Sequence, residues 1–327
     1  MPSHRPLVRL ALPVLAVLAV AVPARAADVD KYLPDDTQFV VTVNVKELLA
    51  TPAVKQNALP QLKALLQANG DVSDTLKDLG FDPLADLDSV QAAGPGGGEP
   101  DKVLVIVHGR FDLDKFRKAA AAAEKDHGDV FTIHKVNDGK GGQFQLYEVN
   151  LPEQNTPIFV SLPNNKTVLV SLGKDFVVDA LRKEFRNEKP ALKDSDFQTL
   201  LERQDPKHHV SFAAGGTALA NANLPADVAA ALRNLDGLGG GVTVGDDIKL
   251  EVVGLAKNAQ GARELGKTVN DGVTQGVLLL GLAAMANPDL QPLLDVVKSV
   301  RCSVRDKTVT VKAEVSKEVL EGLLKDK

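Results

Sequence analysis

The chain has almost no cysteine and few aromatic residues. Its 327 residues include a single cysteine, Cys302, and no tryptophan. One thiol cannot form an internal disulfide or supply a structural zinc site, so a packed core must stabilise the fold. Surfaces that bind sugars or peptides usually rely on Trp and Tyr, and this composition disfavours both classes.

The sequence also lacks a basic block. Removal of an amino-terminal segment with three arginines, described below, leaves 35 of the 38 basic residues against 43 acidic ones, a net charge of −8. A mildly acidic chain of this kind has no electrostatic footprint for nucleic acid or for anionic lipid. We therefore expect no nucleic-acid partner.

Glycine-rich stretches occur, but none matches a phosphate-binding loop. Such a loop needs Gly-x-x-x-x-Gly-Lys-[Ser/Thr] between a strand and a helix. Gly94–Gly98 and Gly139–Gly142 each lie between two predicted strands, and the first lacks the required Lys and Ser/Thr. We interpret both as hairpin loops and Gly237–Gly241 as a flexible turn before a strand.

No local pattern predicts a catalytic or metal site. Gly-x-Ser-x-Gly is missing, and Ser171 lacks the first glycine of that motif. Cys302 occupies an inward strand position, and His108, a conceivable base, ends a predicted core strand. His208 and His209 should point to opposite faces of a strand and cannot share an ion. The acidic pairs Asp35-Asp36 and Asp246-Asp247 lie in predicted turns, where Asp is expected for backbone reasons. We assign no catalytic, cofactor-binding or metal-binding residue and expect no cofactor.

The amino terminus has the order of a secretory signal peptide. Arg5 and Arg9 precede the apolar run Leu7–Val22, and Ala24-Arg25-Ala26 forms a small-x-small cleavage site. The run is shorter than a membrane-spanning helix and contains Pro13. Residues 1–26 are therefore predicted to be removed, which leaves no integral membrane segment and places the mature protein in the periplasm or outside the cell.

A strand–turn–strand–helix unit closes the chain at Ser299–Leu324. Val300, Cys302 and Val304 alternate with polar residues, and a second alternating run follows a polar break. After Ser316 the apolar period becomes helical. The same order is predicted for Ile158–Phe185.

Two segments of the chain share one order of elements, which predicts an internal duplication. Strand, broken helix, hairpin with helix, and hairpin with helix describe residues 36–185, if 130–150 is an insertion, and also residues 208–324. We expect an α+β fold with two related lobes, 27–206 including a connector at 186–206, and 207–327. Each lobe should be an antiparallel sheet of hairpins with helices packed on one face.

One helix is unusually apolar. A long helix is predicted from about Ala259 to Ala286, and its end, Val277–Ala286, is apolar on nearly all sides. Such a helix is buried from several directions or lies in an interface. The alternatives are a central core helix and the wall of an apolar groove between the lobes, which would hold lipid or a partner. The apolar stretch itself is too short to span a bilayer.

The segment after the signal peptide, YLPDDTQFVVTVNVKELLATPAV (Tyr32–Val54), resembles the start of uncharacterised exported bacterial proteins of a domain-of-unknown-function type. These begin with Leu-Pro-x-x-Thr, a strand and a helix, and continue with repeated hairpins and helices. The resemblance implies no activity and no site residue.

The sequence therefore predicts an exported protein that is a non-catalytic extracytoplasmic binding or structural module. It does not identify the partner and leaves an apolar ligand and a protein as open alternatives. One alternative is a hydrolase whose dispersed site leaves no motif. Another is a carrier of an apolar ligand, which requires a hydrophobic cavity beside Val277–Met285.

Overall fold

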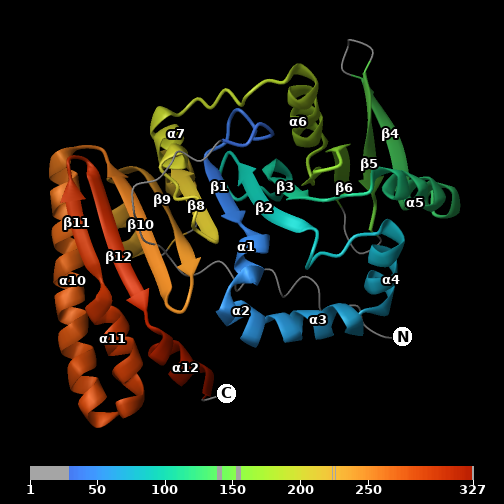
Figure 1. Cartoon of the computed structure of the whole chain (residues 1–327). Helices are drawn as coiled ribbons and strands as arrows, with labels where there is room; N and C mark the ends of the chain where they lie inside the picture. Colours follow the sequence, from blue (N-terminus) through green and yellow to red (C-terminus); the bar gives the residue numbers. More distant parts are fainter. Residues whose placement is uncertain (1–28, 138–141, 152–155, 223, 225, 326–327) are drawn as a thin grey trace.

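The computed structural model describes residues 29–137, 142–151, 156–222, 224 and 226–325. Within these residues the strands form one 12-stranded antiparallel sheet in the order β11-β12-β10-β9-β8-β1-β2-β3-β7-β6-β5-β4 (Figure 1). The predicted α+β fold with antiparallel hairpins is confirmed. The predicted signal peptide, residues 1–26, lies outside the described residues.

The strands are short, and most are joined to a neighbour by a hairpin. Their bounds are β1 Phe39–Val43, β2 Leu87–Gly94, β3 Leu104–Gly109, β4 Phe131–Asn137, β5 Gln143–Val149, β6 Ile158–Asn164, β7 Thr167–Ser171, β8 Val210–Gly215, β9 Leu235–Val244, β10 Ile248–Ala256, β11 Arg301–Arg305 and β12 Thr308–Val315.

The helices contain between 6 and 28 residues. Their bounds are α1 Val45–Ala50, α2 Pro52–Asn57, α3 Leu59–Ala68, α4 Gly70–Leu79, α5 Leu113–Asp126, α6 Lys174–Arg186, α7 Ser195–Glu202, α8 Gly216–Asn221, α9 Ala226–Leu232, α10 Ala259–Ala286, α11 Gln291–Ser299 and α12 Lys317–Lys325, with short 3₁₀ turns at Pro100–Lys102 and Pro288–Leu290.

The sheet extends in both directions from a central pair, β1 and β8. One arm runs β1-β2-β3-β7-β6 and the other β8-β9-β10-β12-β11, so the two predicted segments place their strands in the same order. The β4–β5 hairpin continues the first arm, as expected for an insertion. Because β1 pairs with β8 over its whole length, the halves share one continuous sheet rather than forming two separate ones. The duplication itself remains a prediction.

The closing unit and its predicted counterpart agree in their strands but differ in their helices. β12 pairs with β10 as β7 pairs with β3. However, α6 packs on β6 and β7 and buries Val177, Ala180 and Leu181, whereas α12 contacts α11.

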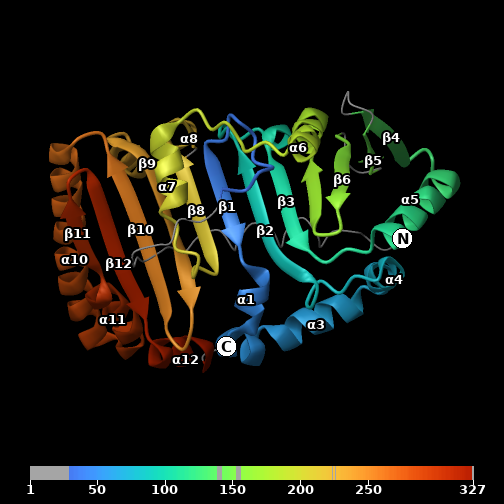
Figure 2. The same ribbon diagram turned by 45° about the horizontal axis from the view of Figure 1, so that its top comes forward.

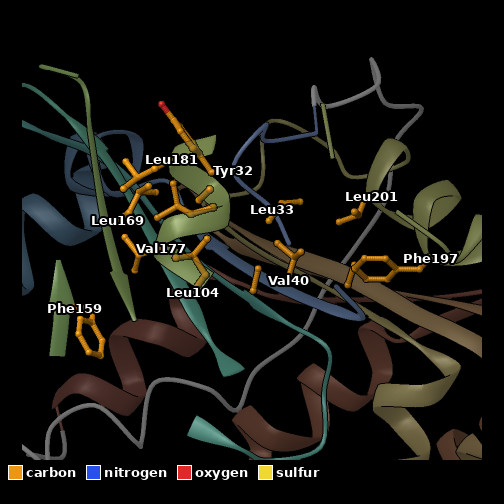
Figure 3. Packing of buried hydrophobic residues seen from close by; sticks show 14 of the residues in the cluster. Tyr32, Leu33, Val40, Leu104, Phe159, Leu169, Val177, Leu181, Phe197 and Leu201 are labelled. Carbon is orange, nitrogen blue, oxygen red and sulfur yellow. The ribbon is translucent and has the colours of Figure 1, made fainter. Parts of the chain in front are cut away.

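One face of the sheet, here called the packed face, carries the main core. Val40, Leu104, Ile106 and Leu169 lie on alternate strand positions and are at most 3% exposed. They pack against α6, against the segment before β1, and, nearer the centre, against Phe197 and Leu201 of α7 (Figure 3). The 186–206 segment, predicted as a connector with an amphipathic middle, thus contributes a core helix.

Helices also cover the opposite face of the sheet. There Phe116 of α5 packs near Tyr147 of β5, with ring centroids 5.3 Å apart. At the other end of the sheet, α10 packs Ala262 and Leu265 against Val309 of β12. A sequence that predicts a hairpin followed by a helix does not show on which face of the sheet the helix packs.

The glycine run Gly237–Gly241 lies inside β9, so its prediction as a turn is also wrong. On the packed face, a Cβ atom at Gly237 would lie 2.5 Å from Cδ1 of Leu200 in α7. At Gly241 it would lie 2.3 Å from Nδ1 of His208. These strand glycines therefore allow α7 and the His208 ring to approach the backbone closely.

Candidate functional site

His108, considered above as a possible base, lies near the end of β3 beside an acid from the amino-terminal segment. Its Nε2 is 2.5 Å from Oδ2 of Asp30, and its Nδ1 is 3.4 Å from Oγ1 of Thr167. The hydrogen bond to Asp30 raises the pKa of His108, although burial opposes the shift. The arrangement joins a hydroxyl, an imidazole and a carboxylate in one row.

This row does not present a nucleophile. The Thr167 side chain lies on the packed face and the residue is only 3% exposed. A hydroxyl buried to this degree cannot meet a substrate. The row instead ties the segment before β1 to the sheet.

A second polar network fixes the same segment to α6. The Tyr32 hydroxyl donates to Glu184 at 2.8 Å and accepts from Asn164 at 2.9 Å, while Lys31 forms an ion pair with Glu184. Burial would raise the pKa of Glu184, but the hydrogen bonds from Lys31, Tyr32 and Asn164 outweigh it and lower the pKa. Burial also raises the pKa of Tyr32. The network therefore joins a neutral phenol to an ionised carboxylate.

A polar cleft of about 720 Å³ opens beside this network, between the amino-terminal segment and α6. Several of its charged side chains form ion pairs: Lys183 lies 2.6 Å from Asp35, and Arg182 lies 2.7 Å from Asp179. The Lys183 hydrogen bond lowers the pKa of Asp35 against the effect of burial. Because the two signs of charge are intermixed, the cleft favours no single ligand charge.

The paired histidines do not form a metal site. His208 is buried against Gly241, whereas Nδ1 of His209 accepts a hydrogen bond from the Val244 amide at 3.0 Å. Burial lowers the pKa of His209. Among the described residues, no group of three or more His, Cys, Asp or Glu side chains could hold an ion.

Cys302 and Ser171 have structural surroundings. Cys302 is half-buried in β11 beside α10, and burial raises the pKa of its thiol, which disfavours the reactive thiolate. Ser171 donates to the Val103 carbonyl at 2.7 Å and accepts from the Gly173 amide.

The remaining motifs are turns. Gly94–Gly98 joins β2 to β3, and Gly96, Gly97 and Gly98 have positive φ angles of 75°, 137° and 78°, so a hairpin loop is confirmed. The Asp246-Asp247 pair lies between β9 and β10, where Asp247 accepts from the Lys317 amide at 3.0 Å. Residues 139–141 of the other glycine loop lie outside the described residues.

The apolar end of α10 is exposed on its outer side. α10 has the predicted bounds, and its inner side packs on β11, β12 and α11. On the outer side Leu278, Leu279, Leu282 and Met285 are 64%, 67%, 61% and 85% exposed, and Leu293 of α11 is 48% exposed beside them. We call these five residues the apolar end. α10 is neither a central core helix nor the wall of a groove between lobes.

By length and composition, α10 as a whole could cross a membrane, since it has 28 residues and an 18-residue window with a mean hydropathy of 1.3. The outer side of its first half, however, is polar, with Lys267, Thr268, Asp271 and Thr274 exposed. The apolar character is thus confined to the free end of the α10–α11 hairpin.

The face opposite the packed face carries a continuous row of valines across six strands. Cross-strand pairing places side by side Val242, Val210, Val43, Val90, Val107 and Val168. Every one of these side chains is only partly buried. We call this row the valine row.

An apolar cavity of about 370 Å³ lies at one end of the valine row, beside α4 and α5. Its floor is formed by Val90, Val107 and Val168, which are direct cross-strand partners. Sequence reasoning missed it, because the register that aligns these three valines depends on strands far apart in the chain.

No family model matches the chain, and no curated protein matches it. Two solved structures are similar over most of its length, both of TP0453. Crystal form IV covers 93% of this chain and 97% of that chain at 11% identity with a TM-score of 0.44. Crystal form I covers 91% and 97% at 13% identity with a TM-score of 0.42. At these values neither carries a functional argument, and the resemblance of Tyr32–Val54 to uncharacterised exported proteins stays a prediction.

Proposed function

We propose that the chain is a non-catalytic extracytoplasmic binding module that attaches to the surface of a lipid bilayer through the apolar end. The observation that carries the proposal is the exposure of five large aliphatic side chains at the free tip of a helical hairpin. The tip of this hairpin projects from the sheet (Figure 1). A projecting apolar tip can insert into a deformable lipid layer more readily than it can fit the pocket of a rigid protein partner. The predicted export to a membrane-bounded compartment agrees with it.

The size of the apolar end supports weak, reversible attachment. Full burial of a Leu or Met side chain contributes about 1.5–3 kcal/mol, so five side chains at their observed exposures contribute about 5–10 kcal/mol. A single myristoyl chain, which binds membranes reversibly with a constant of about 10⁴ M⁻¹, falls within this range.

A second group of exposed aliphatic residues lies along the same edge of the molecule. Leu62 and Leu65 of α3 and Val72 of α4 are 38%, 50% and 40% exposed. In both views α3, α12 and the tip of the α10–α11 hairpin line one edge (Figures 1 and 2). A planar surface would contact both groups together.

The charges near the apolar end indicate which lipid is favoured. Asp289 lies in the 3₁₀ turn after α10, whereas Asp295 of α11 forms an ion pair with Lys298 at 3.4 Å. Acidic neighbours on a net acidic chain repel anionic headgroups. We therefore expect attachment to phosphatidylcholine vesicles to be at least as strong as attachment to vesicles with added phosphatidylglycerol.

Flotation of the mature chain with vesicles tests the proposal. The wild-type chain should float with phosphatidylcholine vesicles, and the combined substitutions Leu278→Gln, Leu279→Gln, Leu282→Gln and Met285→Gln should reduce the bound fraction at least tenfold. These positions are exposed, so the fold should persist, as circular dichroism would show.

Four substitutions on the polar half of the same side of α10, Thr268→Ala, Asn270→Ala, Thr274→Ala and Gln275→Ala, serve as the matched control and should leave flotation unchanged. Failure of the wild-type chain to float, or equal flotation of the glutamine variant, would contradict the proposal. A concentration-dependent dimer abolished by the glutamine variant, without flotation, would assign the apolar end to self-association instead.

A further inference from the structure

We infer that the apolar cavity at the end of the valine row binds one unbranched alkyl chain. The site is separate from the apolar end of α10, and the inference does not depend on bilayer attachment. The sequence left a carrier of an apolar ligand as one alternative and expected its cavity beside Val277–Met285. The inference places the ligand in a different cavity.

The floor of the cavity is a flat hydrocarbon surface. Val90, Val107 and Val168 come from three adjacent strands and stand side by side, because each is the register partner of the next. All three are only partly buried, although the residues before and after Val168, Thr167 and Leu169, are almost fully buried on the packed face. Apolar surface of this kind at the centre of a sheet gains from a cover.

The walls close around the floor without filling it. Leu79 and Phe81 come from the end of α4 and the loop after it, Phe111 comes from the loop before α5, and Phe116 comes from the first turn of α5. Phe81 and Phe111 stack with centroids 5.1 Å apart and planes at 24°, which makes one wall rigid. The remaining volume of about 370 Å³ is within the range of ligand pockets. It corresponds to about a dozen chain groups, each of about 30 Å³.

The side chains that line the cavity determine which class of ligand it can bind. Asp112 is the one lining residue with a polar side chain, and its Oδ1 already caps α5 by accepting from the amides of Asp114 and Lys115 at 3.1 and 3.0 Å. A ligand inside the cavity thus finds carbon surfaces and a single carboxylate, one oxygen of which is already engaged in the cap of α5. This excludes recognition of a sugar or nucleotide and favours a methylene chain whose polar head remains at the mouth.

Isothermal titration of the mature chain with sodium dodecanoate, below its micelle concentration, tests the inference. We expect saturable binding of one molecule per chain. Val107→Phe places a ring on the floor and should weaken binding at least tenfold, and Val90→Phe is a second blocking variant if the first folds poorly. Val105→Phe is the matched control, since Val105 has the same strand and the same face but does not line the cavity; its affinity should remain within twofold of wild type.

Lauroyl-lysophosphatidylcholine, titrated in parallel, distinguishes the source of the chain. Binding of both probes assigns the cavity to acyl chains in general, and binding of dodecanoate alone assigns it to free fatty acids. The inference would be overturned if neither probe showed saturable binding, or if Val107→Phe and Val90→Phe left the binding unchanged. The glutamine variant of α10 should bind dodecanoate normally, so failure here and failure of bilayer attachment are separable.

Discussion

Glu251 of β10 should make the protein less stable as the pH rises towards neutrality. The residue is 3% exposed on the packed face, and its Oε1 has no hydrogen-bond partner. Burial raises its pKa from 4.5 to about 7, although the positive charge of its cross-strand neighbour Lys312 acts in the opposite direction. Asp205 adds to the upward shift.

The magnitude follows from the difference between the folded and unfolded states. In the unfolded chain the carboxyl ionises near 4.5, whereas in the folded protein it keeps its proton until about pH 7. Between these values the folded state binds more protons, so its free energy of unfolding falls as the pH rises. At 1.36 kcal/mol per pKa unit the loss is about 3 kcal/mol, complete above pH 7.

Glu251→Gln removes this ionisation and keeps the side-chain shape. Urea unfolding should show the variant up to about 3 kcal/mol more stable than wild type at pH 8 and similar to it at pH 4.5. Glu314→Gln, at an exposed position of β12, is the control and should show the same small difference at both pH values. The reasoning is refuted if the Glu251→Gln difference does not change with pH, or if the variant is less stable at pH 8.

Two further predictions concern the amino-terminal segment and the glycines. The contact of Asp30 with His108 raises the pKa of the histidine, so the contact stabilises the fold fully below pH 6.5 and loses this effect as the pH rises through the raised pKa. Asp30→Asn should therefore lower the melting temperature more at pH 6 than at pH 9. An equal decrease at both pH values would contradict this expectation. Gly237→Ala should cost about 1–3 kcal/mol in chemical unfolding, because its Cβ would lie 2.5 Å from Leu200. Gly272→Ala, with nothing within 4 Å in the middle of α10, should instead stabilise by up to about 1 kcal/mol, and the same sign for both changes would show that the close approach of α7 does not matter.

The sequence predicted those features that depend on local periodicity. Alternation in Val309–Val315 and the helical period of Ala259–Ala286 gave elements with correct bounds or nearly so. Part of β9 was missed, because its glycines carry no side chain and so show no alternation of apolar and polar residues. The need for glycine there becomes clear only from the position of Leu200 next to the strand. The same is true of function: the exposure of Leu278 and the alignment of Val107 with its neighbours are set by contacts between distant segments.

The pairing of β1 with β8 has a consequence for how the chain folds as it is synthesised. β1 is the first of the described strands along the chain, but of its two partners only β2 follows soon; β8 comes more than 160 residues later, as the pair Val43–Val210 shows. All other strands of the first arm find their partners within residues 39–171, so that arm can assemble with β1 as an open edge. An unpaired central strand is a template for association with other chains. During synthesis, the arrival of β8 is thus the event that pairs this edge, and a delay at the 186–206 segment would prolong the interval in which two nascent molecules can join.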